Sequence, residues 1–142
     1  MRYLGLDLGT KTLGISITDK TNTLVSPLKV LRFNFEDYKS VIGELKDIIR
    51  VNNIKLVVLG LPKNMDGSTG FAGERSLKFK EMLELEGINV ELVDERMTTV
   101  MAENIIHTNN ENIKNTKNKI DSIAACLILE SYLKRCANDI KE

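Results

Sequence analysis

Metal-binding and redox-active side chains are scarce in this chain, and their scarcity narrows its chemistry. The 142 residues include two cysteines and one histidine. Cys126 and Cys136 lie in a segment that we expect to form one helix, where a separation of ~15 Å excludes a disulfide. Small, buried apolar side chains are the favoured interpretation of both. His107 has no second histidine or cysteine near it to complete a zinc site, so an ordinary helix side chain is favoured there.

Long apolar runs and an excess of one charge are also missing. No stretch approaches the ~18–20 apolar residues of a membrane span, and Asp7 interrupts the segment where a signal peptide would be apolar. We therefore expect a cytoplasmic protein without membrane contact. The 20 basic and 20 acidic side chains cancel, which argues against strong, indiscriminate binding of nucleic acid. Lys114, Lys117 and Lys119 form a local basic group, for which a solvated loop is the favoured interpretation.

The length and composition are typical of one globular domain. Hydrophobic residues make up 42% and charged residues 28% of the chain. These values are close to globular averages and exclude disorder, collagen and coiled coil. A chain of this length buries enough surface to fold without a metal or a disulfide. We therefore expect a single domain over residues 1–142.

Hydrophobic periodicity predicts an α/β protein. Three strands in residues 2–33 are joined by connections too short for parallel crossovers, so they should form an antiparallel meander. The segments that follow are predicted as helix 35–51, strand 55–61, helix 71–86, strand 88–95, helix 97–108 and helix 119–137. Glu36 and Asp37 are expected in the first turn of the first helix. Two right-handed crossovers then complete a five-stranded mixed sheet, three antiparallel and then two parallel strands, with helices on both faces.

Acidic side chains fall at three notable places in this order. Asp7 lies within the first strand, in a stretch that should be central to the sheet, where a carboxylate needs a cation or donors. Asp94 and Glu95 close the last strand at its carboxyl end, where open α/β sheets bind their ligands. Asp121 lies in the first turn of the final helix.

Each of these acids also has a purely structural interpretation. Asp7 could cap a turn through the backbone amide of Gly9 or Thr10. Glu95 could simply pair with Arg96, and Asp121 could interact with the dipole of its own helix. Taken singly, none of the three establishes a site.

Taken together, the acids indicate metal chemistry. If the fold brings three carboxylates to one side of the sheet, their charges require a divalent cation. Mg²⁺ or Mn²⁺ suits an all-oxygen set of ligands. Two such ions could activate a water and stabilise the leaving oxygen in phosphodiester hydrolysis. A serine or cysteine nucleophile would lack its base, because His107 has no evident partner.

Two glycine-bearing loops offer modest support. The segment GLDLGTKTLG combines glycines with Thr10 and Lys11, so its backbone amides and lysine could contact a phosphate. Tight hairpins require glycine as well, however. GLPKNMDGSTG at 60–70 follows a buried strand, which is typical of a binding loop, with a flexible connection as the alternative.

These motifs resemble those of one known family. The stretches DLGTKTLGIS at 7–16, GLPKNMDGSTG at 60–70, VDERMTT at 93–99 and KIDSIAACLILESYL at 119–133 are similar, in order, to the signatures of the YqgF/RuvX family. Its ribonuclease H-like members are described as Holliday junction resolvases and as nucleases that mature the 5′ end of the small-subunit ribosomal RNA precursor. The resemblance spans essentially the whole chain. It implies a ribonuclease H-like fold and hydrolysis of precursor ribosomal RNA, in ribosome biogenesis, or of a DNA junction.

The resemblance also assigns roles by position. Asp7, Glu95 and Asp121 match the family's metal ligands and are expected to bind Mg²⁺ or Mn²⁺ as the catalytic residues. Asp94 belongs to the same motif as a supporting or substitute acid. The positions expected to orient this corner or to contact the substrate are Arg96, Thr98 and Thr99 in the motif, and Lys11, Lys63 and Ser68 along the approach.

Two other functions stay open at this point. A non-catalytic RNA- or ribosome-binding module would keep the fold and the acids for structure. An actin- or hexokinase-like phosphotransferase would use DLGTKTLG as a phosphate loop, but such proteins need two domains of this kind closing on ATP. Junction resolution requires two active sites and hence a dimer, and the sequence leaves monomer and homodimer open.

Overall fold

The computed structural model describes residues 2–63, 66, 68–94 and 123–136. Its elements are β1 (Arg2–Leu8), β2 (Thr12–Thr18), β3 (Val25–Arg32), α1 (Lys39–Val51), β4 (Ile54–Leu61), α2 (Phe71–Leu85), β5 (Val90–Asp94) and a helix over residues 123–136, here named the C-terminal helix. The helix expected over 97–108 lies outside the described residues. Within the described part, no helix is both long enough and apolar enough to cross a bilayer.

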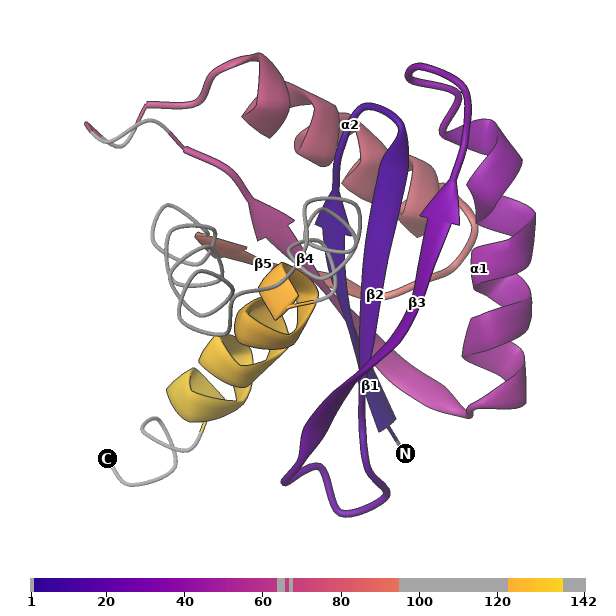
Figure 1. The fold of residues 1–142 in the computed structure, drawn as a ribbon, viewed down its shortest axis with the longest axis vertical. Helices are drawn as coiled ribbons and strands as arrows, with labels where there is room; N and C mark the ends of the chain where they lie inside the picture. Colours follow the sequence, from indigo (N-terminus) through magenta and orange to yellow (C-terminus); the bar gives the residue numbers. More distant parts are fainter. Residues whose placement is uncertain (1, 64–65, 67, 95–122, 137–142) are drawn as a thin grey trace, which may run out of the picture.

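The strands form one mixed sheet in the order β3-β2-β1-β4-β5 (Figure 1). β2 pairs antiparallel with β1 and with β3. β4 runs parallel to both β1 and β5. The predicted five-stranded mixed sheet is confirmed, and β1 is its central strand.

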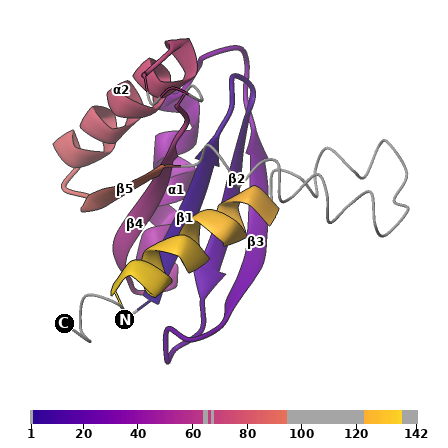
Figure 2. The same ribbon diagram turned by 90° about the vertical axis from the view of Figure 1, so that its left-hand side faces the viewer.

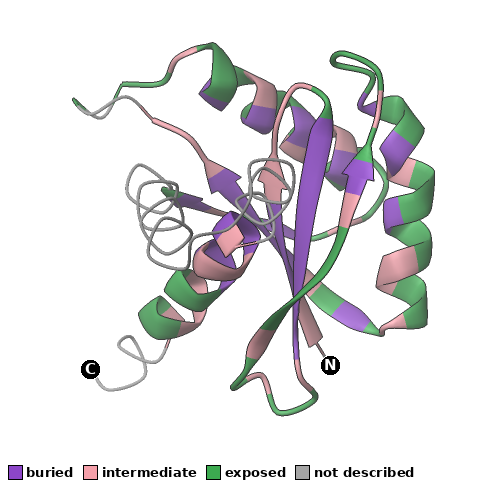
Figure 3. Cartoon of the chain, viewed as in Figure 1, coloured by how far each residue is buried: buried purple, intermediate pink, exposed green. Residues whose placement is uncertain are grey.

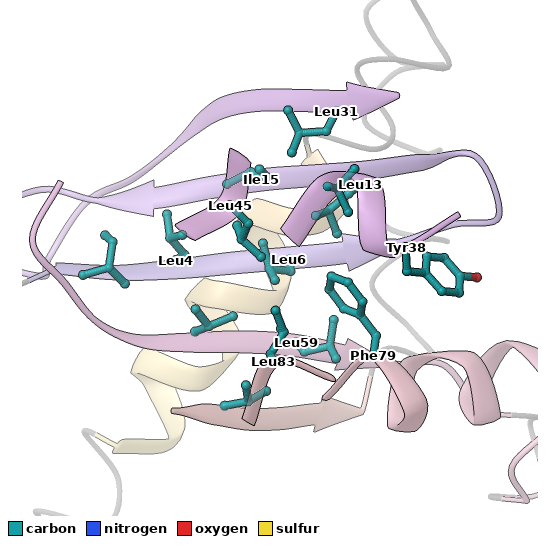
Figure 4. Packing of buried hydrophobic residues seen from close by; sticks show 14 of the residues in the cluster. Leu4, Leu6, Leu13, Ile15, Leu31, Tyr38, Leu45, Leu59, Phe79 and Leu83 are labelled. Atoms are coloured by element: carbon teal, nitrogen blue, oxygen red, sulfur yellow. The ribbon is translucent and has the colours of Figure 1, made fainter. Parts of the chain in front are cut away.

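Helices cover both faces of the sheet, as predicted (Figures 1 and 2). α1 and α2 lie on one face, where Leu4 and Leu6 of β1 join Leu45, Phe79 and Leu83 of the helices in the main core (Figure 4). The C-terminal helix lies on the other face. β2 is buried along its whole length between these layers (Figure 3).

The almost unbroken apolar run of β4 reflects burial on both of its faces. Val57 and Leu59 belong to the main core under α1 and α2. Val58, between them, faces the opposite way and packs in a second cluster with Val93, Ile128 and Leu129. Successive side chains of β4 point to opposite faces, so the strand contributes to both hydrophobic clusters.

α1 begins later than the periodicity predicts. Its first residue is Lys39, and Glu36 has a positive φ of 55°. The Glu36 amide donates a hydrogen bond of 2.9 Å to the Thr10 carbonyl in the β1–β2 loop. The expectation that Glu36 and Asp37 form the first helical turn is wrong, because this tertiary contact holds the segment in a turn before the helix.

The C-terminal helix packs against the sheet through one narrow face. Its completely buried side chains are Ala124, Ala125, Ile128 and Leu129. Ile123 and Leu127, which are also apolar, are half-buried. Cys126 and Cys136 in this helix are both half-buried, and their thiols are free.

Gly5→Ala is expected to destabilise the fold by about 1–3 kcal/mol, because added atoms overfill a close-packed contact. A Cβ built on Gly5 would lie 2.6 Å from the Ala125 carbonyl oxygen and 2.8 Å from Leu129 Cβ, and would also meet the Ser16 hydroxyl. Chemical denaturation would measure the loss.

Gly43→Ala in α1 is the matched control. No atom lies within 4 Å of a Cβ built at Gly43. Alanine is also the better helix former, so this variant should gain about 0.5–1 kcal/mol. Equal stability of the Gly5 and Gly43 variants would show that β1 and the C-terminal helix are not in tight contact.

Candidate active site

The carboxyl ends of β1, β4 and β5 lie at one edge of the sheet, and the arrowheads of β1 and β4 lie side by side in the upper half of Figure 1. β1, β4 and β5 run parallel, so their last residues lie side by side there. From this edge the chain leaves β1 toward β2 on one side and leaves β4 toward α2 and β5 on the other. Ligands of open α/β sheets bind where neighbouring connections diverge in this way. The candidate site therefore lies at the ends of β1 and β4.

Asp7 occupies this position. It is half-buried and is the last residue but one of the central strand. Tyr3 and Gly5, at alternate positions of β1, contact the C-terminal helix. Asp7 shares their face of the sheet, since side chains alternate along a strand. Its partner on β2 is Gly14, which has no side chain to fill the space opposite.

The turn after β1 closes through its own backbone. The Gly9 amide donates a hydrogen bond of 2.8 Å to the Thr12 carbonyl. This bond uses the Gly9 donor that a turn cap by Asp7 would require. The turn is therefore held by a hydrogen bond between its own backbone groups.

The C-terminal helix is held against the same face by a polar contact. The buried Ser16 hydroxyl donates a hydrogen bond of 2.7 Å to the Ala125 carbonyl. Farther from the edge, the rings of Tyr3 and Tyr132 meet edge to face with their centroids 6.0 Å apart. Helix and strand therefore run in opposite directions, and later residues of β1 meet earlier residues of the helix.

The sequence analysis did not identify Ser16 as a residue that positions the C-terminal helix. The signal is present in β2, where Gly14, Ser16 and Thr18 alternate with large apolar residues. A face of small residues on a buried strand indicates that another backbone approaches closely. Here that backbone belongs to the C-terminal helix.

Asp94 faces away from Asp7. It ends β5, two residues after Leu92, which packs against the main core, and one after Val93, which belongs to the cluster under the C-terminal helix. Alternation along β5 therefore places Asp94 on the side of α1 and α2. The structure does not bring the expected supporting acid to the face of Asp7.

The expected substrate-contacting residues that are described all lie in loops at this edge. Lys11 is exposed between β1 and β2, and Lys63 is half-buried two residues after β4. Ser68 is exposed in the same loop as Lys63, where its hydroxyl donates a 2.6 Å hydrogen bond to Asp66. Two cationic side chains thus flank the end of β1, while Ser68 already has a partner within its loop.

The remaining predicted site residues lie outside the described residues. These are Glu95, Arg96, Thr98, Thr99 and Asp121, together with His107 and the lysine group at 114–119. The described part of the chain holds no cluster of three or more metal-binding side chains. It includes one of the three predicted ligands, Asp7, whose carboxylate suits a hard cation.

The thiol of Cys126 is unsuited to nucleophilic chemistry. Burial raises its pKa to about 11, and the negative charge of Glu130 adds to the effect. Burial likewise raises the pKa of Tyr132 to about 12, with a hydrogen bond to Cys136 contributing. Both groups are protonated at neutral pH, in agreement with a packing role for this helix.

Comparisons with known proteins agree with this geometry. The profile of a protein family described as "RuvX: Holliday junction resolvase" matches residues 1–135. A relative from Staphylococcus haemolyticus is 43% identical over 136 residues, covering 93% of this chain and 94% of its own. A relative from Staphylococcus aureus is 42% identical over 134 residues, with the same coverage of 93% and 94%. Both names assign these relatives, provisionally, as pre-16S rRNA nucleases.

Solved structures of resolvases share the fold. Thermus thermophilus RuvC aligns with a TM-score of 0.56 at 11% identity, covering 96% of this chain and 97% of that one. The fowlpox virus Holliday junction resolvase aligns with a TM-score of 0.53 at 18% identity, covering 96% and 99%. At such identities the likeness concerns the fold alone, and it confirms the expected ribonuclease H-like architecture.

The raised pKa of Cys126 predicts slow alkylation. In a Cys136→Ser variant, Cys126 is the sole thiol. Its reaction with iodoacetamide at about pH 8 should be at least ~100-fold slower than that of free cysteine, whose pKa is ~8.5. The rate should keep rising up to a pH near the thiol's pKa of about 11. A plateau near pH 9 would contradict the burial argument.

The raised pKa of Cys126 also determines how the free energy of unfolding changes with pH. The folded pKa lies above the unfolded value, so the folded state retains the proton more tightly. The contribution of the protonated thiol is therefore fully present below the unfolded pKa. It is lost as the pH rises toward 11.

Proposed function

The chain belongs to the RuvX family of Holliday junction resolvases, and from this premise we propose that it is a metal-dependent nuclease that hydrolyses phosphodiester bonds in structured nucleic acid. Asp7, Glu95 and Asp121 are the proposed metal ligands and catalytic residues. The observation that carries this proposal is the position of Asp7. Its carboxylate lies at the carboxyl end of the central strand, on the face held against the C-terminal helix.

Within the pair of acids at the end of β5, the proposal assigns the metal to Glu95. Asp94 lies on the face of α1 and α2, opposite to Asp7. Glu95, the next residue in the sequence, is the acid of this pair that the family resemblance assigns as a metal ligand.

The spacing between β1 and the C-terminal helix supports Asp121 as the third ligand. Two strand residues advance by ~6.6 Å, which matches about four helical residues. Tyr3 contacts Tyr132, and Gly5 lies against Leu129 and Ala125. The same advance from Gly5 to Asp7 leads toward the start of the described helix, and Asp121 precedes that helix in the sequence. We therefore propose Asp121 as the third ligand.

The proposed ligands fit Mg²⁺ or Mn²⁺ by donor type. All three are carboxylates, and the chain has one histidine and no pair of cysteines spaced for zinc. When bound, one or two such ions would supply an activated water and charge stabilisation at the leaving oxygen. The carboxylates would fix their positions, which makes each of the three acids necessary.

The loops at the edge would hold the substrate. Lys11 and Lys63 flank the end of β1 and would contact backbone phosphates, which set the register of a nucleic acid. Arg96, Thr98 and Thr99 would orient the corner around Glu95. These contacts are local, which accords with a chain whose net charge is zero.

Precursor 16S ribosomal RNA is the proposed natural substrate. The relatives at 42–43% identity that cover nearly the whole chain carry that name. Holliday junctions are the second candidate, because the family description and the structures with the same fold name them. Cleavage at the 5′ end of the ribosomal precursor needs one active site, whereas junction resolution needs two.

Asp7→Asn should reduce Mn²⁺-stimulated cleavage by at least ~100-fold, because an amide cannot supply the ligand's charge. Glu95→Gln and Asp121→Asn should cause similar losses. Cleavage of precursor 16S ribosomal RNA and of a four-way DNA junction, mapped side by side, would measure each variant.

Asp94→Asn is the discriminating control, since Asp94 lies on the opposite face and should retain most activity. Asp47→Asn, an exposed carboxylate in α1, controls for a change of net charge. Cleavage by Asp7→Asn at the wild-type rate would overturn the proposal. Binding of either substrate without cleavage by the wild type would select a non-catalytic binding module instead.

A further inference from the structure

The phenylalanines fall into two groups with opposite environments. Phe33 and Phe79 pack edge to face against Tyr38, with ring centroids 5.5 and 5.8 Å away, in the main core. Phe71 is 81% exposed and Phe35 is 61% exposed. Burial of these two rings contributes little to the free energy of folding, because most of their surface stays in contact with water. The question is what Phe71 is placed to contact.

Phe71 lies at the edge of the sheet that carries Asp7. It is the first residue of α2. Two residues on, Gly73 fits so closely that a Cβ there would lie 2.8 Å from the Pro62 carbonyl oxygen, directly after β4. One helical turn on, Arg75 forms an ion pair of 3.6 Å with Glu36. These contacts fix the start of α2 beside the end of β4.

The second exposed ring lies at the same edge. Phe35 precedes Glu36, whose amide is bound to the Thr10 carbonyl in the β1–β2 loop. The Arg75–Glu36 pair therefore links the loop of Phe35 to the first turns of α2. Both exposed aromatic residues therefore belong to segments at the edge of the sheet that carries the proposed nuclease site.

The surroundings of Phe71 suit a nucleotide better than an apolar protein partner. Ser68 and Thr69, just before it in the chain, are exposed polar residues. Lys63 lies in the same loop. A protein interface would favour a contiguous apolar patch, which these neighbours do not provide. An exposed flat ring in a polar loop that also carries a lysine is suited to stacking on a base, with the lysine available to a phosphate.

We propose that Phe71 is a stacking platform for an unpaired base of the nucleic acid substrate. A base inside a duplex is covered on both sides by its neighbours, so the platform selects single-stranded or distorted regions. This inference rests on the proposed nuclease function, because it concerns the substrate of that site. It adds a specificity residue at the first position of α2, outside the group of acids.

The chain has no tryptophan, which allows a direct spectroscopic test. Phe71→Trp places a single indole at the platform, and Leu85→Trp places one at the other end of α2, about 21 Å away. Leu85 is 87% exposed, so the two sites match in exposure. Both variants are titrated with a short single-stranded oligoribonucleotide, and with the blunt duplex of the same sequence, in low salt with EDTA.

The expected result is strong fluorescence quenching of Phe71→Trp by the single strand, little by the duplex, and little for Leu85→Trp with either. Phe71→Ala should weaken single-strand binding roughly tenfold without lowering Tm, since the exposed ring does not support the fold. Phe71→Tyr should restore the affinity.

Three results would overturn the proposal: equal quenching of both tryptophans, no quenching of Phe71→Trp, or unchanged affinity of Phe71→Ala. The assay contains EDTA and measures binding alone. A failure of stacking is therefore separable from a failure of metal-dependent cleavage, which is measured without any change at Phe71.

Discussion

The contact between the central strand and the C-terminal helix determines the geometry of the proposed site. Gly5 lets the helix backbone approach β1 more closely than any larger residue would. The Ser16 hydroxyl satisfies the Ala125 carbonyl across that contact. The absence of a side chain at Gly5 sets the distance between the helix and the sheet. The buried hydrogen bond sets the position of the helix along β2. Asp7, two residues beyond Gly5, therefore lies on the face of the sheet that this helix covers.

The sheet separates the face that carries Asp7 from the face that packs against the main hydrophobic core. The face under α1 and α2 holds most of the hydrophobic side chains and ends at the edge with Asp94. The other face carries small residues, a single carboxylate on β1 and the docked helix. Because side chains alternate along each strand, Asp7 and Asp94 belong to different layers although both lie near the carboxyl ends of their strands. This separation keeps Asp94 apart from the proposed site.

Much of this arrangement could be predicted from local patterns. The short connections in residues 2–33 required antiparallel pairing, and the apolar run of β4 required burial on both faces. The central position of Asp7 followed from those two features. The start of α1 could not be predicted, because the Glu36–Thr10 hydrogen bond joins segments distant in the chain. The face of the C-terminal helix was ambiguous as well, since Ile123, Leu127 and Leu129 are all apolar and only packing selects among them.

The central claim is that Asp7, Glu95 and Asp121 bind one metal centre, and calorimetric titration of the protein with Mn²⁺ tests it without any substrate. The account predicts saturable binding by the wild type that is abolished or strongly weakened in each of the three single amide variants, while their folded structure persists by circular dichroism. Wild-type affinity in the Asp7→Asn variant, or no saturable binding by the wild type, would contradict it.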